Sequence, residues 1–550
     1  MQIERIINQH IPADQQAEFD HGRVLSLLMA ARLYSPVALD NVAEWAGESG
    51  ADLLWGMPLE KINDDRLGRS LDAFFTQRHS ILASLALHVA QEFDVPLNDV
   101  HYDPTHIVFH GAYESSQPRA GVVGDGVVRS DDLLDPAHIT KGRAGQDTPD
   151  GVQLVHAGLF THVDEYGPLP IYGHTVDGNQ NGRTAVREGW ELVRQRLKPQ
   201  KLTMISDRGT FSAGHLARLR EADCRAICSA PWNEFRPLFD AQFKRLKWKQ
   251  ASYLSIEQQR RRDTNSELPR EHYELAVVKH SLEHEGATIP CRVIFVFSTA
   301  DQKVVRKQRE KQITKLREGL QKLQKSVAEG RRNTDPASVS RRVNKLLGKK
   351  QAAKYFQWEL IPLNKKEQAS LPKPQSGCKR PTNRFHFTFD SRERRRDEQY
   401  DGYSALVTTV PLQEGSADLL FTKFKQQCYS EQVNSQFKGP LAVHPVFLKS
   451  PLRVEALVFL MIATLMVYYL LQRMYRQSLP DTASTKQRRT TSKTLLRAFS
   501  TYIVFIHRTP LGREVRPSRP TKRQTEILRQ LGLPSPAQRL RTRLPRAPTR

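Results

Sequence analysis

Cysteine is scarce in this sequence, which has five in a chain of 550 residues. So sparse and odd a set argues against a disulfide framework and is typical of a protein from a reducing compartment. Cys224 and Cys228 have no second pair at the spacing of a zinc site, so we interpret both as core residues. The first eleven residues lack an apolar run and include Glu4, Arg5 and His10, so no secretory signal is expected.

Long hydrophobic runs are also few. The run 456–471 is apolar apart from Thr464 and two tyrosines, and Arg453 and Glu455 lie at its entrance. A helix needs about 20 apolar residues to span a membrane. Because this run is shorter, we predict a helix buried in a large core and expect no membrane partner. A membrane-anchored protein is the alternative that the run leaves open.

Negative charge is scarce relative to positive charge. The chain has 83 Lys or Arg and 59 Asp or Glu, which gives a formal net charge of +24 at pH 7. Such a surplus predicts a polyanionic partner, with nucleic acid ahead of an anionic membrane. Residues 473–550 hold 19 Lys or Arg against three acids. Their end, rich in Pro and Arg, is predicted to be a disordered basic tail.

Composition and periodicity divide the chain into five parts. Apolar residues at helical spacing predict a helical domain over 1–95, which is a candidate for DNA binding. Strand and helix patterns alternate over 96–234 and return over 397–475, which predicts a mixed α/β core in two parts. Between them, 235–396 is predicted to be an insertion of strands and a charged helical hairpin. The basic region 476–550 follows.

The individual elements are predicted from the same patterns. In the core, strands are expected at 100–109, 153–161, 169–174, 202–205, 226–228 and 406–410, and helices at 183–197, 213–219 and 419–437. In the insertion, strands are expected at 273–278, 291–297, 356–361 and 385–389, and antiparallel helices within 300–331 and 339–356. Asp64 or Asp65 is expected to cap an N-terminal helix. In the C-terminal region, Thr521 and Gln524 form a capping-box pattern that predicts a helix start.

Two aspartates occupy strand positions where chemistry is often placed. The apolar run 202–205 ends in Ser206-Asp207-Arg208-Gly209, which predicts a buried strand that places Asp207 at its carboxyl end. Ligands gather outside the carboxyl ends of strands in open α/β sheets. Asp103 lies in a second predicted strand. For Asp207, capping of the following helix is the structural alternative.

A third carboxylate lies on the predicted helix 419–437. Four side chains there are spaced as one stripe of a helix, at intervals of three, four and seven residues: Phe424, Gln427, Glu431 and Lys438. Glu431 therefore has polar neighbours, although a solvated helix face is the alternative. With Asp103 and Asp207 it forms a candidate Mg²⁺ site, because Mg²⁺ prefers oxygen ligands and leaves positions for water and phosphate. Two ions about 3.5–4 Å apart can assist phosphodiester transfer.

The order and spacing of these motifs resemble DDE-type insertion-sequence transposases of the IS-four superfamily, and more narrowly its IS-sixteen-thirty-four group. The resemblance covers most of the chain and rests on Tyr102-Asp103-Pro104-Thr105, Ser206-Asp207-Arg208-Gly209, Glu431 with Lys438, residues 63–69, Gly178-Asn179, Asp401-Gly402 and residues 453–456. On the glutamate helix the family pattern is Tyr, Arg, Glu and Lys. Here Phe424 replaces the Tyr and Gln427 replaces the Arg, which removes a hydroxyl and a positive charge.

The resemblance implies a ribonuclease-H-like catalytic core, an α/β mixed sheet flanked by helices, interrupted by the insertion. It implies a transposase that cuts DNA at transposon ends and transfers the strand into target DNA. The implied catalytic and metal-binding residues, which would hold Mg²⁺ or Mn²⁺ as two ions, are Asp103, Asp207 and Glu431. The implied DNA contacts are Lys438, Gln427, Phe424 and Arg208.

The implied partners are double-stranded DNA, as terminal inverted repeats and as target, and a second copy of the chain in a synaptic complex. The implied location is the bacterial cytoplasm, in association with the nucleoid. Two other functions stay open on the residues alone. One is a metal-dependent DNA nuclease without strand transfer, and the other is a catalytically dead, basic DNA-binding protein in which the three acids are caps and surface charges.

Overall fold

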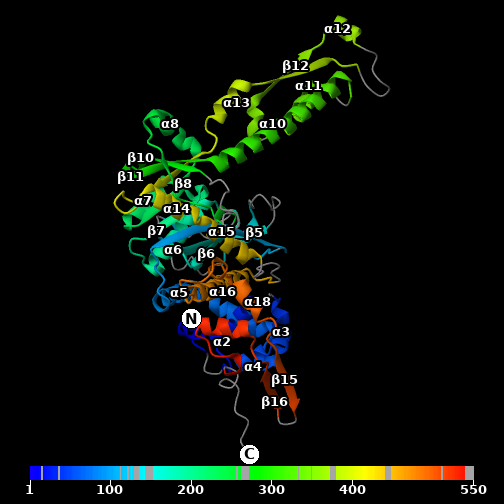
Figure 1. The fold of residues 1–550 in the computed structure, drawn as a ribbon. Helices are drawn as coiled ribbons and strands as arrows, with labels where there is room; N and C mark the ends of the chain where they lie inside the picture. The colour runs from blue at the N-terminus through cyan, green and yellow to red at the C-terminus, as the bar shows by residue number, and fades with distance from the viewer. Residues whose placement is uncertain are drawn as a thin grey trace, which may run out of the picture. The chain divides into compact units, whose positions relative to one another are not determined.

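The computed structural model describes residues 1–13, 17–34, 37–111, 113–119, 123–124, 127–128, 135–142, 153–255, 258–259, 261, 272–331, 334–348, 350–371, 380–439, 448–509 and 512–538. The chain divides into two compact units (Figure 1). The first contains Met1–Pro231, Lys279–Arg292 and Val407–Arg550, and the second contains Trp232–Val278 and Val293–Leu406. Three strands contribute residues to both units: β10 (Tyr273–His284), β11 (Ala287–Ser298) and β14 (Tyr403–Thr408).

A mixed sheet forms the centre of the first unit. Its strands are β1 (Asp99–Phe109), β4 (Thr140–Lys141), β5 (Gln153–Asp164), β6 (Gly167–Asp177), β7 (Thr203–Ser206) and β8 (Arg225–Ala230). β5 pairs antiparallel with β1, β4 and β6, whereas β1 and β7, and β7 and β8, pair in parallel. β6 is buried along its whole length, which explains its nearly continuous apolar sequence. The predicted α/β class with a mixed sheet is confirmed. A separate short hairpin is made by β2 (Val123–Gly124) and β3 (Val127–Val128).

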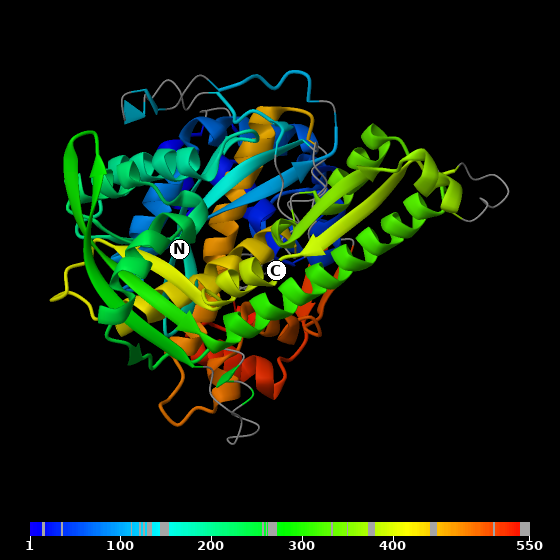
Figure 2. The ribbon, with the colours of Figure 1, turned by 90° about the horizontal axis from the view of Figure 1, so that it is seen from above.

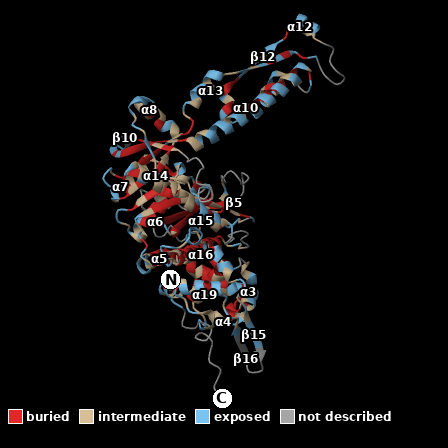
Figure 3. Ribbon diagram, in the orientation of Figure 1, coloured by how far each residue is buried: buried red, intermediate tan, exposed pale blue. Residues whose placement is uncertain are grey.

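The apolar run predicted to be a core helix lies in α16 (Pro451–Gln477). Among the described residues, α16 is the one helix with the length and mean hydropathy of a membrane span, and 89% of its most apolar window is buried inside the protein. It packs against β6 and against α5 (Asp64–Glu92). Figure 3 shows α16 and the central strands as buried. The run is therefore a core helix of this fold, as predicted.

The N-terminal part is helical, as predicted. Before α5 it contains α1 (Ile3–His10), α2 (His21–Tyr34), α3 (Val42–Ser49) and α4 (Ala51–Trp55). The cap of α5 differs from the prediction, because the side chain of Asn63, rather than Asp64 or Asp65, accepts the backbone N–H of Arg66 at 2.9 Å. An asparagine at the N-cap leaves both aspartates in the first turn, where their charge favours the helix dipole.

A buried ion cluster joins the N-terminal helices to α16. Glu455 accepts from Arg78 of α5 and from Arg119, each at 2.8 Å. Burial raises the pKa of Glu455, but Arg119 and Arg78 outweigh it and hold the pKa below its usual value. Two residues before Glu455, Arg453 forms a two-pronged bond to Asp72, against a glycine of α5 that leaves space for it. Two of the stretches noted in the sequence, 63–69 and 453–456, therefore meet in one interface.

Further helices of the first unit cover the sheet and form the C-terminal region. The sheet helices are α6 (Gly182–Leu197), α7 (Ala213–Glu221), α14 (Ala417–Lys425) and α15 (Gln427–Lys438). The C-terminal elements are α17 (Thr485–Arg488), α18 (Ser492–Ala498), β15 (Val504–Thr509), β16 (Gly512–Pro517) and α19 (Lys522–Gln530). The capping box predicted from Thr521 and Gln524 is confirmed at α19. The end of the predicted disordered tail, 539–550, lies outside the described residues.

The predicted helix 419–437 is wrong in one respect: it is two helices. α14 ends at Lys425, and α15 begins at Gln427. The backbone N–H of Gln426 is shared between the carbonyls of Thr422 and Lys423, and the N–H of Tyr429 bonds the carbonyl of Gln426. These shorter i→i−3 bonds tighten the turn and separate the helices. Phe424 therefore lies on a different helix from Glu431.

The second unit contains a helical hairpin with its own core. Its elements are α8 (Trp232–Gln242), β9 (Lys249–Gln250), α10 (Thr299–Ala328), α11 (Pro336–Leu347), β12 (Phe356–Pro362), α12 (Lys365–Ser370), β13 (Asn383–Phe389) and α13 (Ser391–Glu398). Apolar residues of α10 and α11 pack with the antiparallel pair β12 and β13, which lies along α10 (Figure 2). At the base of α10, Asp401 accepts from Arg309, and Gly402 has φ +84° with no room for a side chain. The predicted strands and antiparallel helices of the insertion are confirmed.

Candidate active site

Strand register brings the two predicted aspartates to the same place. β1 and β7 are parallel, and Tyr102 lies opposite Ser206. Asp103 and Asp207 each follow directly, so they lie at the same height on neighbouring strands, which are about 4.8 Å apart in any sheet. Alternation along the strands places both on one face of the sheet. The two aspartates are 104 positions apart in sequence, and the pairing of β1 with β7 brings them together.

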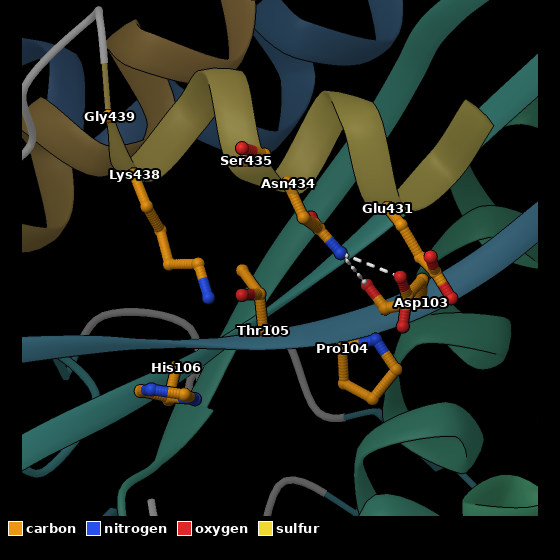
Figure 4. Close-up of a pocket in the computed structure, with 9 residues that line it drawn as sticks. All are labelled: Asp103, Pro104, Thr105, His106, Glu431, Asn434, Ser435, Lys438 and Gly439. Carbon is orange, nitrogen blue, oxygen red and sulfur yellow. Dashed lines mark hydrogen bonds between the residues drawn. The ribbon is translucent and has the colours of Figure 1, made fainter. Parts of the chain in front are cut away.

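The glutamate helix covers this face. Along α15, Glu431 and Asn434 point towards Asp103, and Lys438 points towards Thr105 (Figure 4). Between helix and strand is a cavity of about 590 Å³, lined by Asp103, Pro104, Thr105, His106, Glu431, Asn434, Ser435, Lys438 and Gly439. Its acidic end is formed by Asp103 and Glu431, and Lys438 provides a cation at the other.

Asp103 is held in an unfavourable setting for a negative charge. Burial raises its pKa to about 7, and the charges of Asp207 and Glu431 raise it too. The hydrogen bond from Asn434, at 2.8 Å from Nδ2 to Oδ2, and the charge of Lys438 act in the opposite direction. The charges of Asp207 and Glu431, which come from two other segments of the chain, therefore both reach Asp103. A cation placed among them would relieve that repulsion.

Asp207 is fixed by its local turn. Its side chain accepts the backbone N–H of Gly209 at 3.0 Å at the start of the short 3₁₀ helix η4 (Arg208–Thr210). Its carbonyl accepts the hydroxyl of Thr210 at 2.9 Å. The capping alternative noted from the sequence is therefore realised in part. This capping bond does not prevent Asp207 from binding a metal ion. A carboxylate that accepts one N–H keeps further lone pairs for a ligand.

Within the described residues, no three or more His, Cys, Asp or Glu side chains are grouped so that they could hold a metal ion. Oxygen atoms beside Asp103 could nevertheless serve as ligands. The Oδ1 atom of Asn434 is buried and has no hydrogen-bond partner among the described residues, and it lies next to the carboxylate that accepts from its amide. Carboxylate and carboxamide oxygens suit Mg²⁺ or Mn²⁺, so the residues fit such an ion.

The predicted DNA-contact residues are spread over different surroundings. Lys438 lines the cavity, whereas Phe424, Gln427 and Arg208 are not among the lining residues. Arg208 is exposed beside Asp207. The Oε1 atom of Gln427 is buried without a hydrogen-bond partner, so this side chain points into the protein. Phe424 is half-buried on α14.

Sequence reasoning missed Asn434. It lies three residues after Glu431 and four before Lys438, so it belongs to the same helical stripe. It is 6% exposed, and its amide also approaches the carbonyl of Asp103 at 3.5 Å. The signal was present, because a polar residue at that spacing on a half-buried helix needs a partner. The predicted stripe of Phe424, Gln427, Glu431 and Lys438 passed over Asn434, although Asn434 has the same helical spacing from Glu431.

The far face of β1 is anchored by a buried polar pair. The hydroxyl of Tyr102 bonds Nε2 of His174 at 3.0 Å, and both residues are fully buried. Gly158 makes room for them, since a Cβ there would lie 2.4 Å from each of the bonded atoms. At the start of the strand, Lys423 of α14 bonds Asp99 at 2.7 Å. Asp103 is therefore presented by a strand that is fixed on both sides.

Comparisons with known proteins bear on the N-terminal helices. Residues 1–87 match the model of a domain of unknown function, DUF4277, which is found in transposase-like proteins. The match ends within α5, before the strand that carries Asp103. No curated protein matches the chain.

Proposed function

We propose that this chain is a DDE-type transposase, which uses divalent metal ions to cleave DNA at transposon ends and to join the ends to target DNA. The observation that carries the proposal is the placement of Asp103, Asp207 and Glu431 at one face of the sheet, where the charges of the other two raise the pKa of Asp103. The N-terminal match and the surplus of positive charge agree with it. In this proposal the sheet and its helices form a ribonuclease-H-like core.

The roles follow from where the acids and Lys438 lie. Asp103 and Glu431, which line the cavity, and Asp207, which is not among the lining residues, would hold two Mg²⁺ or Mn²⁺ ions, which when bound supply an activated attacking oxygen and a stabilised leaving oxygen. Asn434 holds Asp103 in position from the helix. Lys438, at the other end of the cavity, provides a charge for a DNA phosphate. Exposed Arg208 and half-buried Phe424 are proposed as outer contacts to DNA, whereas the inward-pointing side chain of Gln427 does not support the contact that the resemblance implies for it.

The partners proposed are the terminal inverted repeats, the target duplex and a second copy of the chain in a synaptic complex. The proposed location is the bacterial cytoplasm, at the nucleoid. A metal-dependent nuclease would use the same three acids without strand transfer. The two functions differ in product, because only a transposase joins a 3′-hydroxyl of the cleaved end to a second duplex.

Incubation with Mg²⁺ and two DNAs tests the proposal. One DNA is a labelled fragment with the gene's own flanking sequence, and the other is an unlabelled plasmid. A transposase is expected to release the labelled end and to attach it to the plasmid. Release without attachment would support the nuclease, and neither reaction at any protein concentration would contradict both.

A further inference from the structure

The C-terminal elements form a charged surface separate from the cavity. Residues 484–530 contain 12 Lys or Arg and two acids. They include α17, α18, the hairpin of β15 and β16, and α19. We call this segment the C-terminal basic module. Nothing in the proposed cleavage chemistry uses it.

The module is folded on a small core of its own. Leu495 of α18 and Ile527 and Leu531 of α19 pack with Tyr475, near the end of α16. Buried polar bonds fix the same side of α18. The hydroxyl of Ser492 bonds the carbonyl of Tyr468, and the amide of Gln524, which is 1% exposed, bonds the carbonyl of Ala498 at 2.8 Å. The position of α18 is therefore set by packing rather than by its charged side chains.

The opposite side of α18 faces solvent. Lys493 and Arg497, one turn apart, are both exposed and form no ion pair within the described part of the chain. Exposed Lys486 lies on α17, just before the turn into α18. Arg516 of β16 and Lys522 at the start of α19 are exposed too. One side of α18 is therefore packed against the protein, and the other side exposes Lys493 and Arg497 to solvent.

The module presents several short elements that carry exposed cations. α17 is one turn of four residues, and the three residues 489–491 connect it to α18, which has seven residues. The antiparallel hairpin of β15 and β16 follows directly. The major groove of DNA, about 12 Å wide, admits one helix, and cations on neighbouring elements then reach the phosphates beside it.

We propose that the C-terminal basic module is a double-stranded DNA-binding site, with the exposed face of α18 in the major groove and the basic residues around it on the flanking phosphates. This inference rests on the proposed function for the identity of the DNA. It is a separate claim about the molecule, because the module lies outside the cavity and its binding needs no metal ion. A duplex is favoured over other polyanions because it is the polyanion on which the proposed function acts.

The test uses the full-length chain in EDTA, so that cleavage cannot occur. Fluorescence anisotropy measures binding to a 30-base-pair duplex of the gene's flanking sequence and, separately, to heparin, over a range of salt concentrations. The variant is K493A/R497A. The matched control, K279A/R395A, removes an exposed lysine from β10 and an exposed arginine from α13, and neither forms an ion pair within the described residues. Circular dichroism and thermal unfolding check that both variants are folded.

The variant is expected to lose on the order of ten-fold in affinity for the duplex near physiological salt, and its salt slope should fall by about two. The control should keep the wild-type affinity within two-fold. An unchanged duplex affinity in K493A/R497A, or a loss for heparin alone, would overturn the inference even if the wild type cleaves DNA. Duplex binding that depends on α18 in a protein that never cleaves DNA would support the inference and contradict the transposase proposal.

Discussion

The amide of Asn434 on α15 donates to the carboxylate of Asp103 on β1 at 2.8 Å, across 331 positions of sequence. This bond ties the helix that carries one candidate metal ligand to the strand that carries another. It lowers the pKa of Asp103 against the larger effect of burial. Asn434, which belongs to no recognised motif, thus helps to set the position of Glu431 relative to Asp103.

Replacement of Asn434 by Leu removes this donor and leaves the helix apolar at that point. Asp103 loses its hydrogen bond, and Mn²⁺ affinity is expected to fall on the order of ten-fold, as for other partners of metal ligands. Isothermal titration with Mn²⁺ measures the change. Ser435→Ala, an exposed position on the same cavity, is the control and should bind as the wild type does. Equal affinity in Asn434→Leu would contradict the role of this bond.

A buried glutamate on α6 predicts a pH dependence of stability. Burial raises the pKa of Glu188 to about 7, from an ordinary value of 4.5 in the unfolded chain. The folded protein therefore binds more protons than the unfolded chain between these values. Its free energy of unfolding should fall as pH rises through this window.

Glu188→Gln removes the ionisation. The variant should be more stable than the wild type at pH 8, by on the order of 2 kcal/mol, and close to it at pH 4.5. Urea unfolding at the two pH values measures the difference. A wild-type stability that is the same at both pH values would show that Glu188 does not titrate in this way.

The buried ion cluster on α16 is expected to be sensitive to loss of one partner. Glu455→Gln leaves Arg78 and Arg119 as buried charges without a carboxylate, which should cost about 3–5 kcal/mol. Asp72→Asn breaks the pair with Arg453, where both side chains are partly exposed, and should cost at most about 1 kcal/mol. Chemical denaturation compares the two variants. Similar losses in both would argue against a buried cluster at Glu455.

Gly158→Ala places a methyl group where the Tyr102 hydroxyl and His174 meet. The ring of Tyr102 must move, with a cost on the order of 1–3 kcal/mol. Tyr102→Phe removes one of the two clashing atoms and leaves Nε2 of His174, so the double variant should lose less than the sum of the two single losses. Thermal unfolding of the three variants tests this. Strictly additive losses would mean that the clash with the Tyr102 hydroxyl contributes nothing to the cost of the methyl group.

Much of the architecture was predictable from the sequence. The apolar run before Asp207 and the β-rich segment around Asp103 indicated two strands, and their parallel pairing then puts both acids on one face. The core position of α16 was predicted from the shortness of its apolar run and its flanking charges, but the folded helix has the length and mean hydropathy of a membrane span, and it is the burial of α16 within the fold that identifies it as a core helix. In these cases one local pattern determined one element.

The remaining features depend on contacts between distant segments. The break between α14 and α15 at Gln426 arises from a few i→i−3 backbone hydrogen bonds. The spacing of apolar residues in the sequence does not indicate such bonds. The identity of the cap of α5 was a choice between adjacent polar residues, decided by which one has extended backbone. The partner of Asn434 lies on another element, so only the folded chain reveals it. The hydrophobic periodicity of a helix indicates which of its sides is buried, but it does not indicate which other element that side contacts.

The most direct test of the account is cleavage of a supercoiled plasmid that carries the gene's own flanking sequences, in the presence of Mg²⁺. Wild type is compared with Glu431→Gln and with Glu414→Gln, which alters an exposed carboxylate paired with Arg225 away from the cavity. The account predicts cutting at the flanks by the wild type and by Glu414→Gln, and none by Glu431→Gln. Equal cutting by all three, or DNA binding without cutting by any, would contradict the assignment of Asp103, Asp207 and Glu431 as the catalytic acids.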